Sequence, residues 1–449
     1  MSVNSAAIGF HPEAARRFDQ LTQEILGTIQ GLGNAAEVSP QKVDFHPIGT
    51  IHPEDILEQP KLVYEVDALG DPAGVFWISR GMRVGWIGPV FQPIKALVDS
   101  MAQTKPFREF VSYEFLLHQT CEWLCETLER RRSDALSEHI AARSHDTIKD
   151  HEIWIPVFRT YSSTEFSIGD VRFRTITREI MDEWWSRIPA KALEDPRNVA
   201  ALNKRRSELQ ASLAACISVR SEEHKAVELA RSAARNATAL LRFLSPANLN
   251  SRLSSYCSPV AMQGMGIYVE VFMNGGRIDH ISRGVQDHRN TEWQLDRSLQ
   301  LRPGVLANLH RLASNRSTEF QQGLYDALIL YSRQSLAVEV SDKLVFALSA
   351  LESMLLRDSN EPIQKNVGER MAFLIGQSKQ ERKDIVKNIE DVYKIRSAFV
   401  HHGQTSRHVD VVDRFLVYAW TTFSRLLDLV PLYKTKAGLL GALEDMKMS

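Results

Sequence analysis

The stretch from Lys379 to Gly403 reads KQERKDIVKNIEDVYKIRSAFVHHG and predicts a helix followed by a stop. Apolar residues recur in it at helical spacing, so we expect a helix over Lys379–Phe399. Gly403 favours a break in the helix near residue 400, because glycine is the usual residue just past a helix C-terminus. The end of this helix is also the part of the chain with the most specific chemistry.

The segments around this helix have the same helical spacing. Strand signals vanish after about residue 315, and short connections favour an antiparallel helical bundle over residues 315–449. The other helices that we expect in it are Glu319–Leu336, Asp342–Leu356, Val367–Ile375 and Val411–Leu429.

The first 310 residues have mixed patterns. Short runs rich in Val, Ile, Tyr, Phe and Trp alternate with amphipathic segments, which predicts an α+β region in front of the all-α bundle. We expect an α+β subdomain over residues 1–132, a polar linker over 133–150 and a second α+β subdomain over 151–310. The strands expected are Lys61–Asp67, Gly74–Ser79, Val84–Phe91, Ile153–Thr160, Asp170–Thr177, Ala214–Arg220 and Gly266–Met273, and the helices are His11–Leu32, Phe107–Arg131 and Glu223–Leu244.

Composition sets limits on function. A chain of 449 residues is too long for one ordinary core, and its 44% hydrophobic content is that of a folded protein. The net charge is −1, and residues 315–449 hold 18 Lys and Arg against 17 Asp and Glu, so a nucleic-acid site would have to be a local patch. Four cysteines, no signal-peptide pattern and no apolar run of about 20 residues favour a reduced, cytoplasmic protein away from membranes.

The run Tyr393–Gly403 contains the residue types that cut RNA without a metal. His401 can transfer protons near neutral pH, and Arg396 is a permanent cation that grips two phosphate oxygens. We assign Ser397 to orienting the motif or binding the phosphate, and His402 to a reserve acid/base or a structural cap. RNA is the expected substrate because its 2′-OH is the nucleophile.

Helical geometry limits how these residues meet. In a continuous helix His401 lies about 140° around the axis from Arg396, and His402 about 240°. The groups converge if the helix breaks near residue 400, or if a second subunit brings its own copy of the motif. The alternative is structural: Arg396, His401 and His402 cap the helix and pair with acids.

The C-terminal segment resembles the HEPN superfamily, specifically its Apea-like group. The family motif is an arginine and a histidine with four to six residues between them, of which the first, directly after the arginine, is polar. Arg396, Ser397 and His401 match this motif with four residues between the arginine and the histidine. His402 matches it with five intervening residues. The order of three pieces carries the resemblance, over about 130 residues: Ala350–Leu356 (ALESMLL), Gly368–Ile375 (GERMAFLI) and Tyr393–Gly403 (YKIRSAFVHHG).

The resemblance implies a HEPN-like bundle of four or five helices that forms a homodimer. In catalytic members the two motifs meet between subunits and act as a metal-independent endoribonuclease, without a cofactor, in toxin–antitoxin, abortive-infection and other antiviral systems. An antitoxin or a phage-derived trigger is therefore an expected further partner. Non-catalytic members use the bundle for dimerisation or binding, and this remains the alternative.

Three other features suggest binding sites but also have structural explanations. His118, Cys121 and Cys125 share a helix face, which suits metal ligands but is more typical of buried core. His46 and His52 each precede a proline and are expected in turns. The run Gly264–Gly266 lacks the later glycine and the helix of a dinucleotide-binding loop.

Overall fold

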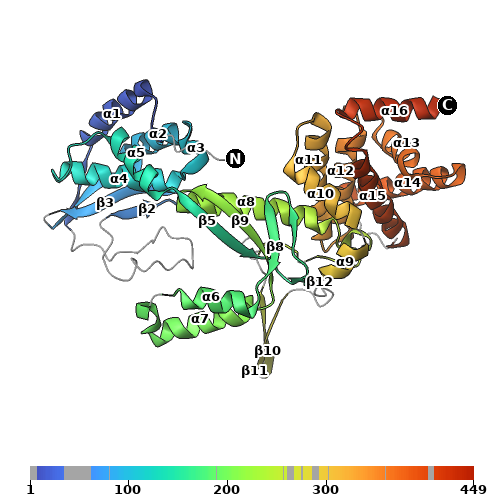
Figure 1. Cartoon of the computed structure of the whole chain (residues 1–449), viewed down its shortest axis with the longest axis horizontal. Helices are drawn as coiled ribbons and strands as arrows, with labels where there is room; N and C mark the ends of the chain where they lie inside the picture. The colour runs from blue at the N-terminus through green and yellow to red at the C-terminus, as the bar shows by residue number, and fades with distance from the viewer. Residues whose placement is uncertain are drawn as a thin grey trace. The chain divides into compact units, whose positions relative to one another are not determined.

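The computed structural model describes residues 8–34, 62–79, 81–188, 190–255, 257–259, 267–274, 277–285, 293–301, 303–358, 360–402 and 409–448. The chain divides into two compact units (Figure 1). The first comprises residues 1–153 and 218–230, and the second comprises 154–217 and 231–449. This division differs from the three consecutive segments that we expected, because the chain leaves the first unit after residue 153 and returns to it at 218.

The first unit contains a four-stranded antiparallel sheet. Its strand order is β1-β4-β3-β2, and helix α1 (Pro12–Leu26) precedes it in the chain. Trp86 of the sheet is fully buried, and its indole Nε1 donates to the Ile25 carbonyl of α1 over 3.2 Å. The strands are β1 (Gln30–Asn34), β2 (Val63–Val66), β3 (Pro72–Ser79) and β4 (Met82–Ile87).

The helices of the first unit correct two expectations. The single helix predicted over Phe107–Arg131 is two helices. The backbone is extended at Val111, where the first helix ends, and Ser112 caps the second by accepting from the Phe115 amide. The predicted linker contains a helix instead, whose Leu136 and Ile140 are fully buried in the core. These helices are α2 (Gln92–Ala102), α3 (Phe107–Phe110), α4 (Tyr113–Leu128) and α5 (Leu136–Thr147).

A second four-stranded sheet has the order β5-β9-β8-β7. Strands β5 and β9, like helix α8 (Glu223–Arg242), contribute residues to both units. Helices α6 (Arg178–Ser186) and α7 (Pro196–Leu209) lie between β8 and β9 in the chain. The strands are β5 (Lys149–Pro156), β7 (Phe166–Ile168), β8 (Val171–Thr175) and β9 (Leu213–Ser221), with β6 (Thr160–Tyr161) pairing in parallel with β12 (Trp293–Gln294) and β10 (Ile267–Asn274) forming a hairpin with β11 (Arg277–Val285).

The C-terminal part of the second unit is helical, as the sequence predicts (Figure 1). Helix α12 packs against α11, α13, α14 and α15, and α14 also packs against α13 and α15. The described structure therefore confirms the general class of α+β elements followed by helices. The helices are α9 (Leu295–Leu301), α10 (Pro303–Ser314), α11 (Glu319–Ser332), α12 (Val340–Leu355), α13 (Ile363–Ile375), α14 (Lys379–His402), α15 (Val409–Leu429) and α16 (Lys436–Met448).

Two buried cations hold the segment after α8 against these helices. The Arg242 guanidinium donates to the Cys257 carbonyl over 2.8 Å and to the Ser332 hydroxyl over 3.1 Å. The Lys343 ammonium donates to the carbonyls of Leu253 (2.7 Å) and Gln334 (3.1 Å). Burial lowers the pKa of Lys343 to about 8, because the charged form loses its hydration. Among the described residues, no helix is both long and apolar enough to span a bilayer.

Candidate functional site

Helix α14 places Arg396 on the side that faces the bundle. Ile385, Ile389 and Val392 are fully buried, and their spacing of four and three residues marks one face of the helix. Arg396 follows Val392 by four residues and continues this face. Its side chain is 30% exposed, so it stands at the margin of the core.

A carboxylate of α12 binds this arginine. The Nη1 of Arg396 lies 3.3 Å from Oε1 of Glu352, and the Tyr393 hydroxyl donates to the same oxygen over 2.8 Å. Burial, followed by the nearby Glu352 charge, raises the pKa of Tyr393, so this phenol keeps its proton. The Nε of Arg396 is buried and has no hydrogen-bond partner in the described part of the chain. Within the described residues, Arg396 therefore has one carboxylate contact, through Nη1.

The outer face of α14 is exposed and polar. Ser397 is exposed, and Lys394 and Lys387 both reach Asp391 over 3.3 Å. In a regular helix position 401 lies about 20° from position 394 and about 40° from position 397. The backbone therefore places His401 on the same face as Ser397 and Lys394, away from the face of Arg396.

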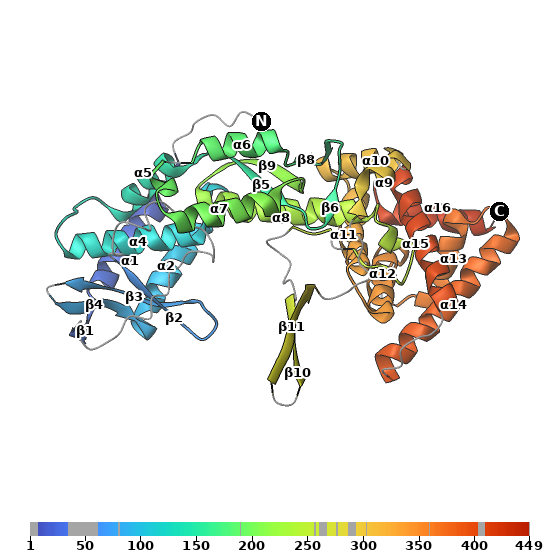
Figure 2. The same cartoon turned by 90° about the horizontal axis from the view of Figure 1, so that it is seen from below.

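Helix α14 is continuous through positions 396 to 402, so it does not break between Arg396 and His401, which was one of our two expectations. Helix α14 runs through His402, and Figure 2 shows its last turns projecting beyond the neighbouring helices. Positions 396 and 401 are thus about 140° apart and about 7.5 Å apart along the axis. The side chains of His401 and His402, and all of Gly403, lie outside the described residues. One copy of α14 does not bring Arg396 and His401 onto one face.

Two residues of this site were not assigned a role from the sequence. Glu352 lies within the quoted run Ala350–Leu356, and Tyr393 opens the quoted run Tyr393–Gly403, but their contact depends on how α12 packs against α14. A signal was present, because Glu352 is a charged residue among the buried positions Leu351, Met354 and Leu355. A carboxylate in such surroundings needs a partner.

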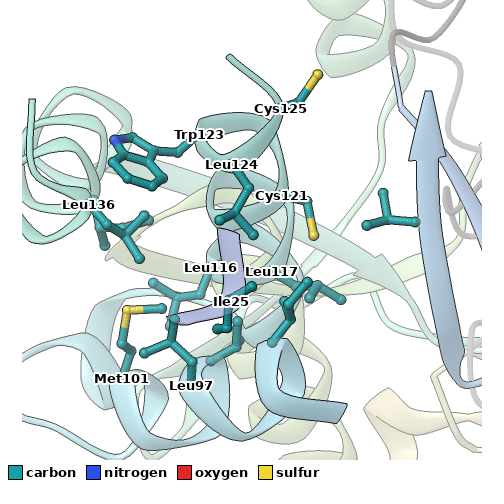
Figure 3. Close-up of a cluster of buried hydrophobic side chains, with 14 of the residues drawn as sticks. Ile25, Leu97, Met101, Leu116, Leu117, Cys121, Trp123, Leu124, Cys125 and Leu136 are labelled. Carbon is teal, nitrogen blue, oxygen red and sulfur yellow. The ribbon is translucent and has the colours of Figure 1, made fainter. Parts of the chain in front are cut away.

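The cysteine face of α4 belongs to a hydrophobic core (Figure 3). Cys121 and Cys125 are buried, and burial raises the pKa of the Cys121 thiol to about 12, which disfavours the thiolate that a metal requires. His118 is exposed and its Nδ1 lies 3.1 Å from the Tyr64 hydroxyl. No cluster of three potential metal ligands occurs in the described residues. His46, His52 and Gly264–Gly266 lie outside them.

Searches against protein-family models, curated proteins and solved structures found no match to this chain. The local geometry around Arg396 is therefore what a functional assignment has to rest on.

Proposed function

We propose that this chain is a metal-independent endoribonuclease of the HEPN type, active as a homodimer. Its motif is Arg396, Ser397 and His401, with His402 in reserve. The 2′-OH of RNA attacks the adjacent phosphorus and loses its proton to a base, the bond to the 5′-oxygen breaks, and that oxygen receives a proton from an acid. The products are a 2′,3′-cyclic phosphate and a 5′-OH. A role in phage defence or a toxin-like stress response goes with this reaction.

The state of Arg396 is the observation that carries the proposal. Glu352 holds the guanidinium from one side, because its Oε1 accepts from Nη1 of Arg396 over 3.3 Å and from the Tyr393 hydroxyl over 2.8 Å. The described residues give the Nη groups of Arg396 no other hydrogen-bond partner, and these groups can donate to a phosphate, whose charge spreads over several oxygens. Glu352 acts here as a positioning residue, since it holds Arg396 without touching the RNA.

The continuity of α14 supports a site shared by two copies. Arg396 and position 401 face different ways on one helix, so a second α14 has to supply the histidine that works with a given arginine. Ser397 and Lys394 are exposed on the face of position 401, where a partner or RNA can reach them. Two such helices give two equivalent sites related by the dimer axis.

The alternative is a non-catalytic module that dimerises or binds a partner through the same helices. The Arg396–Glu352 ion pair favours it, because the pair joins α14 to α12 whether or not RNA is present. In that case Arg396 stabilises the bundle and position 401 takes no part in chemistry.

Incubation of the purified protein with total RNA in EDTA tests the proposal. We expect wild type to cut RNA to 2′,3′-cyclic phosphate ends, and His401→Ala to leave it intact. The matched control is His145→Ala, because His145 is an exposed histidine of α5 in the other unit. Equal cleavage by wild type and His401→Ala, or the absence of cleavage by a folded wild-type dimer with its activating partner present, would contradict the proposal.

A further inference from the structure

A cavity of about 380 Å³ lies among α10, α11 and the C-terminal end of α15, all in the second unit. The residues that line it do not come from α12 or α14, which carry the Arg396–Glu352 pair, so the cavity is separate from that site. Its volume is near the lower end of the range for ligand sites, which suits a group the size of one amino-acid residue.

The polar side of the cavity holds an arginine. Arg311 is exposed and forms no ion pair with any described carboxylate; the contact described for it runs from Nη2 to Oδ1 of Asn308, at 2.5 Å. The described residues give Nε and Nη1 of Arg311 no hydrogen-bond partner. The N–H groups of a guanidinium match the two oxygens of a carboxylate, so Arg311 can bind a carboxylate ligand.

The charge around Arg311 favours a ligand with a single negative charge. The Asn308 amide group donates to Oδ1 of Asp428 over 3.0 Å, so an acid stands one side chain away from Arg311. A carboxylate brings one negative charge to this surrounding, whereas a phosphate monoester brings about 1.5 to 2 at neutral pH. A carboxylate therefore fits the charge of the cavity better than a phosphate does.

Other polar groups of the cavity match the main chain of a peptide. The Gln321 side-chain oxygen accepts from the Ser317 and Thr318 amides, which leaves its NH₂ group to donate to a peptide carbonyl. Asn315 is exposed and can both donate to and accept from a peptide unit. The Nδ1 of His310 is buried without a hydrogen-bond partner in the described part of the chain, and in its protonated form it can donate to a carboxylate oxygen.

The side of the cavity that α15 contributes is apolar. Leu427, Val430 and Pro431 form this wall, at the end of α15 and just beyond. Leu432 follows directly in the chain and is 71% exposed. An apolar side chain can pack against the wall, and Leu432 offers a further apolar contact to a residue that precedes it in a peptide.

We infer that this cavity binds the C-terminal end of a peptide, with the terminal carboxylate on Arg311 and an apolar last side chain on the wall of α15. A free apolar amino acid presents the same carboxylate and side chain. The side-chain amides of the cavity and the exposed Leu432 favour the peptide, because they match a main chain and a preceding residue. The inference does not depend on ribonuclease activity, and it gives the bundle a site that recognises the end of another protein.

Fluorescence anisotropy of the full-length protein with labelled peptides tests this site. The probe is fluorescein-labelled Gly-Ser-Gly-Ser-Leu with a free C-terminal carboxylate, compared with its C-terminal amide and with Gly-Ser-Gly-Ser-Gly. We expect saturable binding of the probe, at least about tenfold tighter than binding of the amide, which cannot form the charged pair with Arg311. The peptide that ends in glycine should bind about tenfold more weakly than the probe or worse, because it buries no side chain on the wall.

Three variants locate the binding site. Arg311→Gln should weaken binding of the probe by about tenfold or more, the usual loss for a charge-assisted hydrogen bond, and should leave binding of the amide unchanged. Ser314→Trp should abolish binding by filling the cavity from an exposed lining position. The matched control is Arg425→Gln, an exposed arginine of α15 that does not line the cavity, and it should bind the probe like wild type.

Competition separates a peptide end from a free amino acid. Unlabelled acetyl-Gly-Ser-Gly-Ser-Leu should displace the probe at a lower concentration than leucine does, and displacement by leucine at the same or a lower concentration would overturn the peptide assignment. Absence of saturable binding of the probe to wild type would overturn the inference. Equal affinity of the probe for wild type and Arg311→Gln would overturn it as well.

Discussion

Arg370 and Arg396 lie in neighbouring helices of one bundle but have opposite surroundings. Arg370 is 2% exposed, and its guanidinium binds Glu361 at 2.6 and 2.9 Å, Glu444 at 3.0 Å and the Leu355 carbonyl at 2.5 Å. Arg396 is 30% exposed and has one carboxylate at 3.3 Å. Arg370 also holds the pKa of Glu361 at about 2.

The difference between these surroundings indicates different roles for the two arginines: Arg370 stabilises the fold, and Arg396 is the proposed phosphate-binding group. Both Nη groups of Arg370 donate to groups of its own chain, so a ligand would have to displace them at the cost of a buried charge. Arg396 keeps donors at the margin of the bundle and can bind a phosphate with its Glu352 contact intact. The proposal therefore predicts that substitution of Arg370 affects folding and that substitution of Arg396 affects activity.

The largest effect is expected for Arg370→Ala. Removal of the guanidinium leaves the carboxylate of Glu361 without its cation and opens a cavity, while Glu444 keeps its ion pair with Arg357, so the unfolding free energy should fall by about 3 kcal/mol. Urea titration followed by circular dichroism measures this change. Arg425→Ala is the control, because its arginine is exposed. A loss below about 1 kcal/mol in Arg370→Ala would remove the contrast on which the comparison is built.

The next effect is expected for Arg396→Ala. Loss of a cation that stabilises the transition state should lower the cleavage rate by about 10²–10³-fold. The unfolding free energy should change by less than about 1 kcal/mol, because the lost ion pair is partly exposed. The same titration and a cleavage assay measure both quantities on one sample. A variant that unfolds easily and retains the wild-type rate per folded molecule would favour the structural role.

Lys343 extends the comparison to a buried cation whose hydrogen bonds go to carbonyls. Its folded pKa of about 8 lies below the ordinary 10.5, so between these values the unfolded state binds more protons. Stability should therefore rise with pH from about 8 to 10.5, by up to about 3 kcal/mol. The measurement is the difference in unfolding free energy between wild type and Lys343→Met at pH 7.5 and 9.5.

Subtracting the Lys343→Met values removes the opposite contributions of groups present in both proteins. The Cys121 and Cys257 thiols have pKa values raised to about 12 and 11, so each lowers stability at high pH. A difference between the two proteins that stays constant with pH would show that Lys343 does not titrate abnormally.

A smaller effect is expected for Glu352→Gln. The amide keeps the shape of the side chain but loses the charge that orients Arg396, so kcat should fall by about tenfold while KM for RNA does not rise. Glu369→Gln is a matched control, because Glu369 also pairs with one cation of the bundle, Lys447. A rise in KM with unchanged kcat would instead place Glu352 in RNA binding.

The sequence predicted the parts of the fold that depend on local pattern. Helices α12, α14 and α15 were expected because their apolar residues recur at helical spacing. In α12, for example, Leu344, Leu348 and Leu351 have this spacing, and the structure buries all three. Helix α5 was not predicted because its sequence is mostly polar and has only two large apolar residues that enter the core, Leu136 and Ile140. Helix α14 runs three residues past the expected Phe399, since histidines do not stop a helix.

The candidate site was predictable only in part. Arg396, Ser397, His401 and His402 were identified from their spacing, and that assignment stays a prediction. The contacts of Arg396 and Tyr393 with Glu352 could not be predicted, because they join two helices through tertiary packing, and Arg396 and Glu352 are 44 positions apart in the sequence. The continuity of α14 through His402 likewise could not be predicted, because Gly403 favoured a break near residue 400.

A mixed dimer tests the central claim, which is that Arg396 of one copy works with His401 of the other. Arg396→Ala and His401→Ala chains with different tags are coexpressed, and the mixed dimer is purified through both tags and assayed on RNA in EDTA. One of its two shared sites then keeps both residues, so we predict about half of the wild-type rate, with each single-variant dimer inactive. A mixed dimer as inactive as either parent, beside an active wild type, would contradict the claim.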